Sequence, residues 1–278
     1  MTLTLDGVTY RYAGASRPSL RDVSLELSPG EVVGVVGASE SGKTTLCLVA
    51  SGLAPRTVGG ILTGRLLLDS TDLAPLPIHA LANLIGIVFS NPATQLTGVA
   101  ATVYEEVAFG PMNLGLPRPQ VIARTESALA ALGIETLAGR DPSLLSGGQQ
   151  QLVSIAGLLA LRPAHLVLDE PTAQLDPAGT WLVAEALTRL AGGGASILVA
   201  EQKTDLLSLV CRRVVALDAG KVTLEGSART VLADPRLDEL GVGPPGAIRL
   251  ARLATRAGLP PVAAHRLDDA FADEALAS

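Results

Sequence analysis

The sequence predicts an α/β fold with a parallel core sheet, an N-terminal antiparallel β subdomain, a helical insert and a small C-terminal extension. Apolar runs of strand length alternate with helical segments along most of the chain, which is typical of a parallel sheet covered by helices. Within residues 1–36, short segments instead alternate apolar and polar residues, which indicates an antiparallel sheet with one solvated face. We therefore expect one large domain over residues 1–235, with a helical subdomain at about 92–148, and an extension over 236–278.

Each expected element follows from its local pattern, beginning with the alternating runs Leu3–Leu5 and Val23–Leu27. Further strands are expected at 31–36, 64–68, 84–89, 166–168, 196–200, 214–218 and 221–225. Helices are expected at 44–52, 121–132, 149–161, 181–191, 206–211 and 248–257. The last helix places Arg249, Arg252 and Arg256 on one face, which we interpret as a solvated basic face, with a docking surface as the alternative. Acidic residues follow near the end, namely Asp268, Asp269, Asp273 and Glu274.

A glycine-rich loop is the most specific motif of the chain. After the β-branched run at 31–36, a glycine, four residues and Gly-Lys-Thr occur in order, and a helix follows. The residues are Gly37, Ala38, Ser39, Glu40, Ser41, Gly42, Lys43, Thr44 and Thr45. Glycines let backbone N–H groups approach a phosphate, Lys43 supplies a positive charge, and the Thr44 hydroxyl is a ligand for Mg²⁺. A glycine-rich turn with a surface lysine is the alternative, but strand, loop and helix together favour a P-loop NTPase core that binds ATP and Mg²⁺.

Two adjacent carboxylates end another apolar run, Ala164–Leu168. Acids at the end of a buried strand cost free energy unless a cation neutralises them. We expect Asp169 to hold Mg²⁺, directly or through water, and Glu170 to polarise an attacking water. An ordinary acidic boundary between strand and turn is the alternative, which the phosphate-binding loop in the same chain disfavours.

The run Leu145-Ser146-Gly147-Gly148-Gln149, called the signature segment below, precedes a predicted helix. Ser146 and the two glycines offer backbone N–H groups to an anion. One chain cannot easily fold this group of donors over its own phosphate-binding loop. We therefore expect a second chain to complete the site.

The phosphate-binding loop, the signature segment and the run Asp169–Thr172 together resemble the ATP-binding-cassette (ABC) ATPases over residues 1 to about 235. The resemblance implies a head-to-tail dimer that sandwiches two ATP molecules and opens after hydrolysis. It implies that Tyr12 stacks on adenine and that the signature segment presses on the γ-phosphate held by the opposite subunit. It also implies that Asp176 lies in the loop that crosses the dimer interface.

Residues 84–119 resemble the energy-coupling-factor (ECF) importers more narrowly. The matching runs are Ile87–Leu96, Thr102–Pro111 and Asn113–Pro117. ECF importers take up vitamins or transition-metal ions such as cobalt or nickel. Their cassettes drive an integral membrane coupling protein, which a separate substrate-binding membrane protein joins. The resemblance implies the same partners here and a groove after Phe89 that faces the membrane partner. Another class of ABC transporter, or a helical insert merely punctuated by Pro, Asn and Gly, is the alternative.

Three residues depart from the family pattern around the chain's own nucleotide. Gln202 stands where cassettes usually have a histidine on the γ-phosphate, and its amide donates hydrogen bonds but carries no charge. Ser90 stands where cassettes usually have a glutamine that senses Mg²⁺ and the attacking water. Gln95, five residues later, matches a different position of the family pattern and not this one. Glu40 replaces a glycine. We hypothesise a heterodimer in which the partner's site does most of the hydrolysis, with accepted variants of ordinary turnover as the alternative.

Two rival functions remain alternatives. A cassette protein without a transporter, such as a translation or DNA-repair factor, usually has two fused cassettes or a long coiled-coil insertion, and neither is recognisable in this sequence. A non-hydrolysing regulatory cassette is disfavoured by Lys43, Asp169 and Glu170 and favoured by Gln202 and Ser90.

Composition agrees with an ATPase that reaches the membrane only through partners, without inserting directly. The chain has 278 residues, of which 48% are hydrophobic and 3% aromatic, so Val, Leu and Ala must form most of the core. No apolar run reaches the roughly 20 residues that span a bilayer, and no secretory signal is recognisable. The net charge of −6 argues against nucleic acid as a partner, and Cys47 and Cys211 fit reduced core thiols. We expect a cytoplasmic protein that is peripheral on the inner face of the cell membrane.

Overall fold

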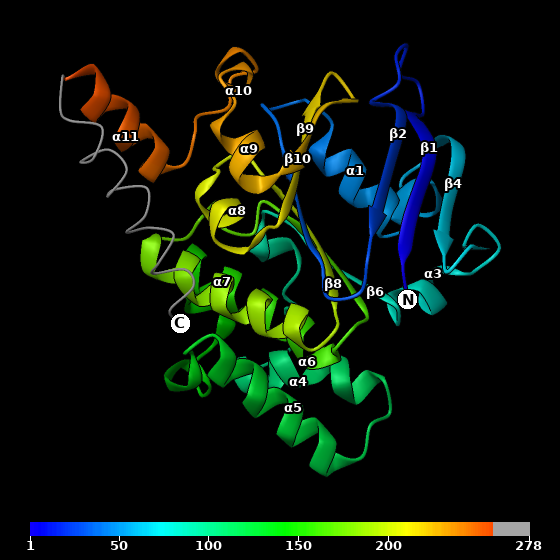
Figure 1. The fold of residues 1–278 in the computed structure, drawn as a ribbon. Coiled ribbons are helices and arrows are strands. Elements are labelled where there is room, and N and C mark those ends of the chain that lie inside the picture. The colour runs from blue at the N-terminus through cyan, green and yellow to red at the C-terminus, as the bar shows by residue number, and fades with distance from the viewer. Residues whose placement is uncertain (258–278) are drawn as a thin grey trace.

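The structure, a computed structural model, describes residues 1–257 of the chain. The acidic residues expected near the end, Asp268, Asp269, Asp273 and Glu274, lie outside the described residues. The described part contains a larger sheet with a smaller N-terminal sheet on one side and most of the helices on the other (Figure 1). Within 1–257, no helix is both long enough and apolar enough to cross a bilayer.

The larger sheet has six strands in the order β10-β9-β3-β8-β7-β6. The strands are β3 (Val32–Val36), β6 (Ile85–Val88), β7 (His165–Asp169), β8 (Ser196–Glu201), β9 (Arg213–Asp218) and β10 (Lys221–Ser227). Strand β10 runs antiparallel to β9, and the other neighbouring pairs are parallel. The expected parallel core sheet is thereby confirmed.

Strand β3 corrects one expectation about residues 1–36. It lies inside the parallel sheet rather than in the antiparallel sheet with the residues before it, and all its residues are buried. Val33 and Val35 share a core with the N-terminal sheet and helix α1 (Lys43–Ala50), whereas Val32 and Val36 share one with the helices of the other face. A strand covered on both faces is apolar throughout, whereas the alternating pattern belongs to strands with one solvated face.

The smaller sheet is antiparallel and has the order β2-β1-β4-β5. Its strands are β1 (Leu3–Tyr12), β2 (Leu20–Leu27), β4 (Gly60–Leu68) and β5 (Thr71–Asp72). Buried and exposed residues largely alternate along β2, as its sequence pattern predicts. Strand β4, which we expected at 64–68, begins at Gly60 because its first residues pair with β1.

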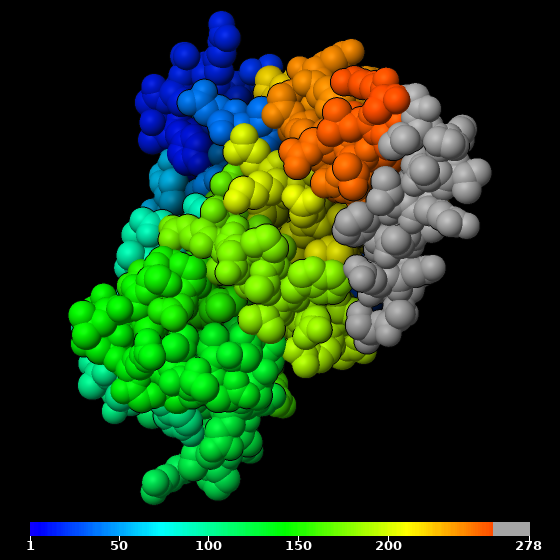
Figure 2. All heavy atoms as spheres, turned by 90° about the vertical axis from the view of Figure 1, so that its left-hand side faces the viewer, coloured from blue at the N-terminus to red at the C-terminus, as the bar shows by residue number. Residues whose placement is uncertain are grey.

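The helical insert forms a lobe at one end of the molecule (Figures 1 and 2). It contains α4 (Val103–Asn113), α5 (Arg118–Ala131) and the beginning of α6 (Gly147–Leu161), with 3-10 turns at Pro92–Thr94, Glu135–Leu137 and Pro142–Leu144. This agrees with the mostly helical segment expected at about 92–148. Helix α6 continues beyond the insert, and its buried Val153 and Ile155 share a core with Val88 of β6 and Leu166 of β7. The signature segment is thereby tied to the parallel sheet.

The remaining helices are α2 (Leu53–Arg56), α3 (Ile78–Ala82), α7 (Pro177–Gly192), α8 (Asp205–Val210), α9 (Ala228–Ala233), α10 (Arg236–Glu239) and α11 (Gly246–Arg256). On α11, Arg249 and Arg256 are exposed, as a solvated basic face requires. Arg252 differs, because its guanidinium lies 2.7 Å from Asp238 and donates to the carbonyl oxygen of Ala233 at 2.9 Å. These contacts hold α11 against residues 233–238, which precede it in the chain. A domain boundary at 235 stays a prediction.

Candidate nucleotide-binding site

The phosphate-binding loop joins β3 to α1 and is tightly closed. A Cβ atom at Gly37 would overlap the Ser41 side chain, and one at Gly42, whose φ is 109°, would lie 2.7 Å from the carbonyl oxygen of Ser19. Both positions therefore require glycine. The Ser41 hydroxyl is buried and has no hydrogen-bond partner within 1–257, whereas Ser39 is exposed. The loop thus holds a polar group that a bound anion or a water could satisfy.

Lys43 lies at the start of α1 with a buried side chain. Its Nζ donates to the carbonyl oxygens of Gly37 at 2.8 Å and Ala38 at 3.0 Å, and it lies 3.5 Å from Oε1 of Glu170. The ammonium is therefore enclosed by the loop. A phosphate bound in the loop would compete with the two carbonyl oxygens for these donors.

Glu40 has a φ of 65°, which is a left-handed conformation. Glycine adopts this conformation without steric cost, which explains why a glycine at this position is favourable. The Glu40 side chain is exposed. It therefore adds a negative charge at the surface of the loop without filling its interior.

Asp169 ends β7 and is 2% exposed, and its Oδ1 has no hydrogen-bond partner among the described residues. Burial raises the pKa of this carboxyl above its ordinary value, and the negative charge of Glu170 raises it further. The hydrogen bond from the Thr44 hydroxyl and the positive charge of Lys43 act in the opposite direction. A divalent cation would satisfy the orphaned oxygen, and the Thr44 hydroxyl interacts with the same carboxyl. Asp169 and Thr44 therefore fit the expected Mg²⁺.

Glu170 has a different environment from its neighbour, because its side chain is 30% exposed. Its φ is 49°, and its backbone N–H donates to the carbonyl oxygen of Ala200 on β8 at 2.8 Å. One acid is thus buried beside the loop and the other is open to water. The roles expected for Asp169 toward Mg²⁺ and for Glu170 toward the attacking water stay predictions.

The residues that depart from the family pattern lie at two strand ends. Gln202 is exposed just beyond β8, and Ser90 is partly exposed just beyond β6. Gln95 does not substitute for a glutamine at 90, because its Oε1 accepts from the Phe89 N–H at 2.8 Å and its Nε2 donates to the Ile87 carbonyl oxygen at 3.2 Å. The Gln95 amide thus pairs with the backbone at the end of β6 in the way that the backbone of a neighbouring strand would. Contacts of Gln202 with a γ-phosphate and of Ser90 with Mg²⁺ stay predictions.

Two other residues implied by the resemblance make local contacts. The Tyr12 hydroxyl lies 3.0 Å from Oγ1 of Thr45, and its ring meets that of Tyr10 edge-on with centroids 5.0 Å apart. This places an aromatic ring against the helix that follows the phosphate-binding loop. Asp176 caps α7 by accepting from the Gly179 N–H at 2.7 Å. Stacking of Tyr12 on adenine and crossing of Asp176 to a partner stay predictions.

The signature segment starts α6 through reciprocal capping. The Ser146 hydroxyl accepts from the Gln149 N–H at 3.3 Å, and Oε1 of Gln149 accepts from the Ser146 N–H at 3.1 Å. A Cβ atom at Gly147 would overlap the Gln174 side chain, and one at Gly148 would lie 3.1 Å from the Gln174 carbonyl oxygen. Glycine at both positions therefore lets the start of α6 lie against the loop before α7.

Sequence reasoning missed Glu201, the last residue of β8. It is 1% exposed, and its Oε1 accepts from the Thr172 backbone N–H at 3.0 Å and from the Thr172 hydroxyl at 2.7 Å. Burial raises the pKa of Glu201 to about 7. An acid at the end of an apolar strand was the available signal, and it is the pattern that pointed to Asp169.

Known proteins resemble this chain over most of its length. The energy-coupling factor transporter ATP-binding protein EcfA of Methanosarcina acetivorans is 38% identical, with 90% of this chain and 88% of that protein covered. The cobalt import ATP-binding protein CbiO of Rhodobacter capsulatus is 38% identical, with 97% and 95% covered. The structure of cbiO1 from Clostridium perfringens, described as part of the ABC transporter complex cbiONQ, matches with a TM-score of 0.75 at 30% identity and covers 96% of this chain and 98% of that one.

Some relatives are longer, since the chain spans 41% and 42% of two ABC transporter ATP-binding proteins from Methanosarcina acetivorans and Methanosarcina mazei. A family model described as ABC transporter matches residues 20–173, which is more than half of the chain. The matched range includes the phosphate-binding loop, the signature segment and both Asp169 and Glu170. The chain therefore belongs to the ABC transporter family of ATP-binding proteins.

Proposed function

We propose that this chain is the ATP-binding and ATP-hydrolysing subunit of an ECF-type importer, which powers uptake of a vitamin or a transition-metal ion through membrane partner subunits. The observation that carries the proposal is the meeting of Lys43, Asp169 and Glu170 at the carboxyl ends of the parallel strands, where Nζ of Lys43 lies 3.5 Å from Oε1 of Glu170. The likeness to EcfA and CbiO supports the importer type.

Hydrolysis follows from the chemistry of these residues. Backbone N–H groups of residues 37–42 would hold the ATP phosphates, and Lys43 would exchange its bonds to Gly37 and Ala38 for bonds to the β- and γ-phosphates. Asp169 and Thr44 would hold Mg²⁺, which neutralises charge on the phosphates. The more exposed Glu170 would orient and polarise the attacking water.

A second cassette is part of the proposal. The signature segment starts α6 in the helical insert, whereas the phosphate-binding loop starts α1. We propose that each cassette offers its signature segment to the ATP held by the other. A membrane coupling protein and a substrate-binding membrane protein complete the importer and hold the chain at the inner face of the cell membrane.

A slow cassette in a heterodimer is a second candidate, and the residues at 90 and 202 favour it. Gln202 carries no ionisable side chain where a histidine is usual, and Ser90 lacks the side-chain amide of the usual glutamine. The side-chain amide of Gln95 is used on the edge of β6, so it does not replace a glutamine at 90.

The test of hydrolysis replaces Glu170 by Gln in the full chain purified with the subunits that accompany it. We expect Mg·ATP turnover to fall about 100-fold or more while ATP binding remains, because the carboxylate acts on water rather than on the nucleotide. Glu185→Gln, which changes an exposed acid on α7, is the matched control and should retain turnover. Full turnover by Glu170→Gln would remove the proposed role of this residue.

The same substitution in the partner cassette separates the two candidates. A slow site here requires Glu170→Gln to reduce total turnover less than the equivalent change in the partner does. Equal losses would rule out the asymmetry. Identification of the membrane proteins that co-purify with the chain tests the importer type, because a cassette protein without a transporter would bring none.

A further inference from the structure

The ends of β7 and β8 remain joined beyond the last pair of the parallel ladder, which is Asp169 opposite Ala200. The Glu170 N–H donates to the Ala200 carbonyl oxygen at 2.8 Å. Two residues later, the backbone N–H and the hydroxyl of Thr172 donate to Oε1 of Glu201 at 3.0 and 2.7 Å. The Glu201 side chain therefore continues the contact between the strands past the point where their backbones separate.

This contact is enclosed by the protein. Glu201 and Thr172 are both buried. Burial raises the pKa of Glu201 to about 7, although the two bonds from Thr172 and the charge of Lys203 act in the opposite direction. Within residues 1–257 the Glu201 carboxyl accepts hydrogen bonds but forms no ion pair, and burial of such a group costs free energy. Groups of this kind concentrate at functional sites. An apolar residue at the end of β8 would avoid that cost but could not bind Thr172.

Glu170 lies directly between the two contacts. Its φ of 49° is a conformation that persists in an L-residue only where the surroundings determine it. Ala200 holds the backbone of Glu170 on one side, Glu201 holds Thr172 on the other, and Pro171 restricts the chain between them. The Glu170 carboxylate is thereby fixed 3.5 Å from the Lys43 ammonium.

We propose that Glu201 is a positioning residue for ATP hydrolysis, which through Thr172 holds Glu170 in the orientation that meets the attacking water. The inference rests on the role proposed above for Glu170. Glu201 is enclosed and binds Thr172, so its effect on the reaction passes through the backbone of residues 170–172.

The experiment uses the full chain with its accompanying subunits and Mg·ATP, and it compares matched pairs of variants. Thr172→Val removes the hydroxyl donor with little change of shape, whereas Thr172→Ser keeps it. Glu201→Leu removes the acceptor, whereas Glu201→Gln keeps an oxygen in its place. We expect kcat to fall about tenfold or more in Thr172→Val and Glu201→Leu, with KM for ATP within about twofold, because misplacing a catalytic group slows the reaction while the loop still binds nucleotide. The Ser and Gln variants should retain most of the turnover.

A double-mutant cycle tests whether the effect passes through Glu170. In the Glu170→Gln background, Thr172→Val and Glu201→Leu should cause no further fall in kcat. A further fall would overturn the inference. A merely structural role would instead lower the fraction of chains that bind ATP and leave kcat per bound ATP unchanged, and this result, measured from binding stoichiometry, would also overturn it.

Two further outcomes distinguish this inference from the function on which it rests. Unchanged kcat in Thr172→Val, while Glu170→Gln abolishes hydrolysis, overturns the role of Glu201 alone. Full turnover in Glu170→Gln overturns the role of Glu170 and the inference with it. Should Glu201→Leu fail to fold, the two Thr172 variants decide, because they leave the buried carboxyl in place.

Discussion

At the scale of single residues, Glu201 makes the free energy of unfolding depend on pH. Burial raises its pKa from 4.5 to about 7. Between these values the carboxyl is protonated in the folded chain and ionised in the unfolded chain, so a rise in pH favours unfolding. Its contribution to stability is therefore complete below pH 4.5 and is lost as the pH rises to about 7.

We predict that Glu201→Gln becomes more stable relative to the wild type as the pH rises through this window. The amide cannot ionise, so it escapes the loss that the carboxyl suffers. The measurement is the free energy of unfolding in urea, for the nucleotide-free chain, at pH values below 4.5 and above 7. Glu185→Gln, at an exposed site, should show no such trend. A difference between Glu201→Gln and the wild type that does not change with pH would contradict the shifted pKa.

Residues of the site differ in how far the sequence could predict them. Lys43 and Asp169 follow from loop chemistry and from the position of an acid after an apolar run, which are local patterns. The bond between Thr172 and Glu201 joins residues 29 positions apart, and no spacing rule says which side chains meet. The contacts of Gln95 could not be predicted for the same reason, because only the structure shows that its amide binds the backbone of β6.

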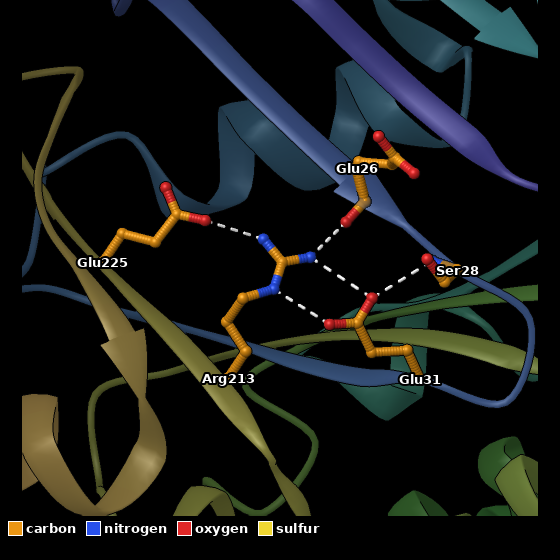
Figure 3. A network of polar contacts seen from close by, with 5 residues as sticks. All are labelled: Glu26, Ser28, Glu31, Arg213 and Glu225. Atoms are coloured by element: carbon orange, nitrogen blue, oxygen red, sulfur yellow. Dashed lines mark hydrogen bonds and ion pairs between the residues drawn. The ribbon is translucent and has the colours of Figure 1, made fainter.

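At the scale of secondary-structure elements, Arg213 joins the two sheets (Figure 3). From the start of β9 its guanidinium donates to Oε1 of Glu31 at 2.9 Å, to Oε2 of Glu31 at 3.2 Å and to Oε1 of Glu225 on β10 at 2.8 Å. It also donates to the carbonyl oxygen of Glu26 on β2, and the Ser28 N–H donates to Glu31. One side chain thus contacts the antiparallel sheet, the connection into β3 and the edge of the parallel sheet.

The network should weaken in acid. Burial alone would raise the pKa of Glu31, but the hydrogen bonds from Arg213 and Ser28 and the charge of Arg213 lower it below the ordinary value of 4.5. A lowered carboxyl pKa contributes stability above 4.5, and this contribution is lost as the pH falls through the folded-state pKa.

We predict that Arg213→Lys lowers the free energy of unfolding by about 1 kcal/mol at neutral pH, because an ammonium cannot reproduce the paired bonds to Glu31. The difference should shrink in acid as Glu31 becomes protonated. Arg65→Lys is the matched control, since Arg65 and its partner Asp6 are 62% and 45% exposed. It should cost less than about 0.5 kcal/mol. Equal costs for both changes, measured by denaturant unfolding, would contradict the role of Arg213 in joining the sheets.

Elements with their own local patterns were predictable, and elements held by a distant partner were less so. The capping box of Ser146 and Gln149 starts α6 at Gly147, close to the expected 149. Strand β4 extends to Gly60 because its first residues pair with β1, although several of them are exposed and show no strand pattern of their own. Strand β3 was predicted as a strand, but its sheet depends on which faces other elements cover.

At the scale of the whole molecule, strand order assembles the site. The sheet places β8 between β3 and β7, so the segments that follow these three parallel strands lie side by side at the same edge of the sheet. Hydrophobic periodicity predicted most of the strands and the two kinds of sheet. It could not predict which strands become neighbours, because that order depends on the packing of crossover helices rather than on any one segment.

We predict that Gly148→Asp separates nucleotide binding from assembly with a second cassette. A Cβ atom at 148 would lie 3.1 Å from the Gln174 carbonyl oxygen, and an added carboxylate at this helix N-terminus would repel the phosphates of a partner's ATP. The chain's own ATP binding should persist, because it uses the separate loop at 37–45.

Sedimentation velocity in the Glu170→Gln background, with Mg·ATP and the accompanying cassette or a second copy, measures the association. Gly148→Asp should abolish it, whereas Gly157→Asp on the same helix should not, because no atom of the described chain lies within 4 Å of a Cβ added at 157 beyond its local neighbours. Equal association of the two variants would show that the start of α6 lies outside the interface. Loss of ATP binding in Gly148→Asp would show instead that the signature segment serves the chain's own nucleotide.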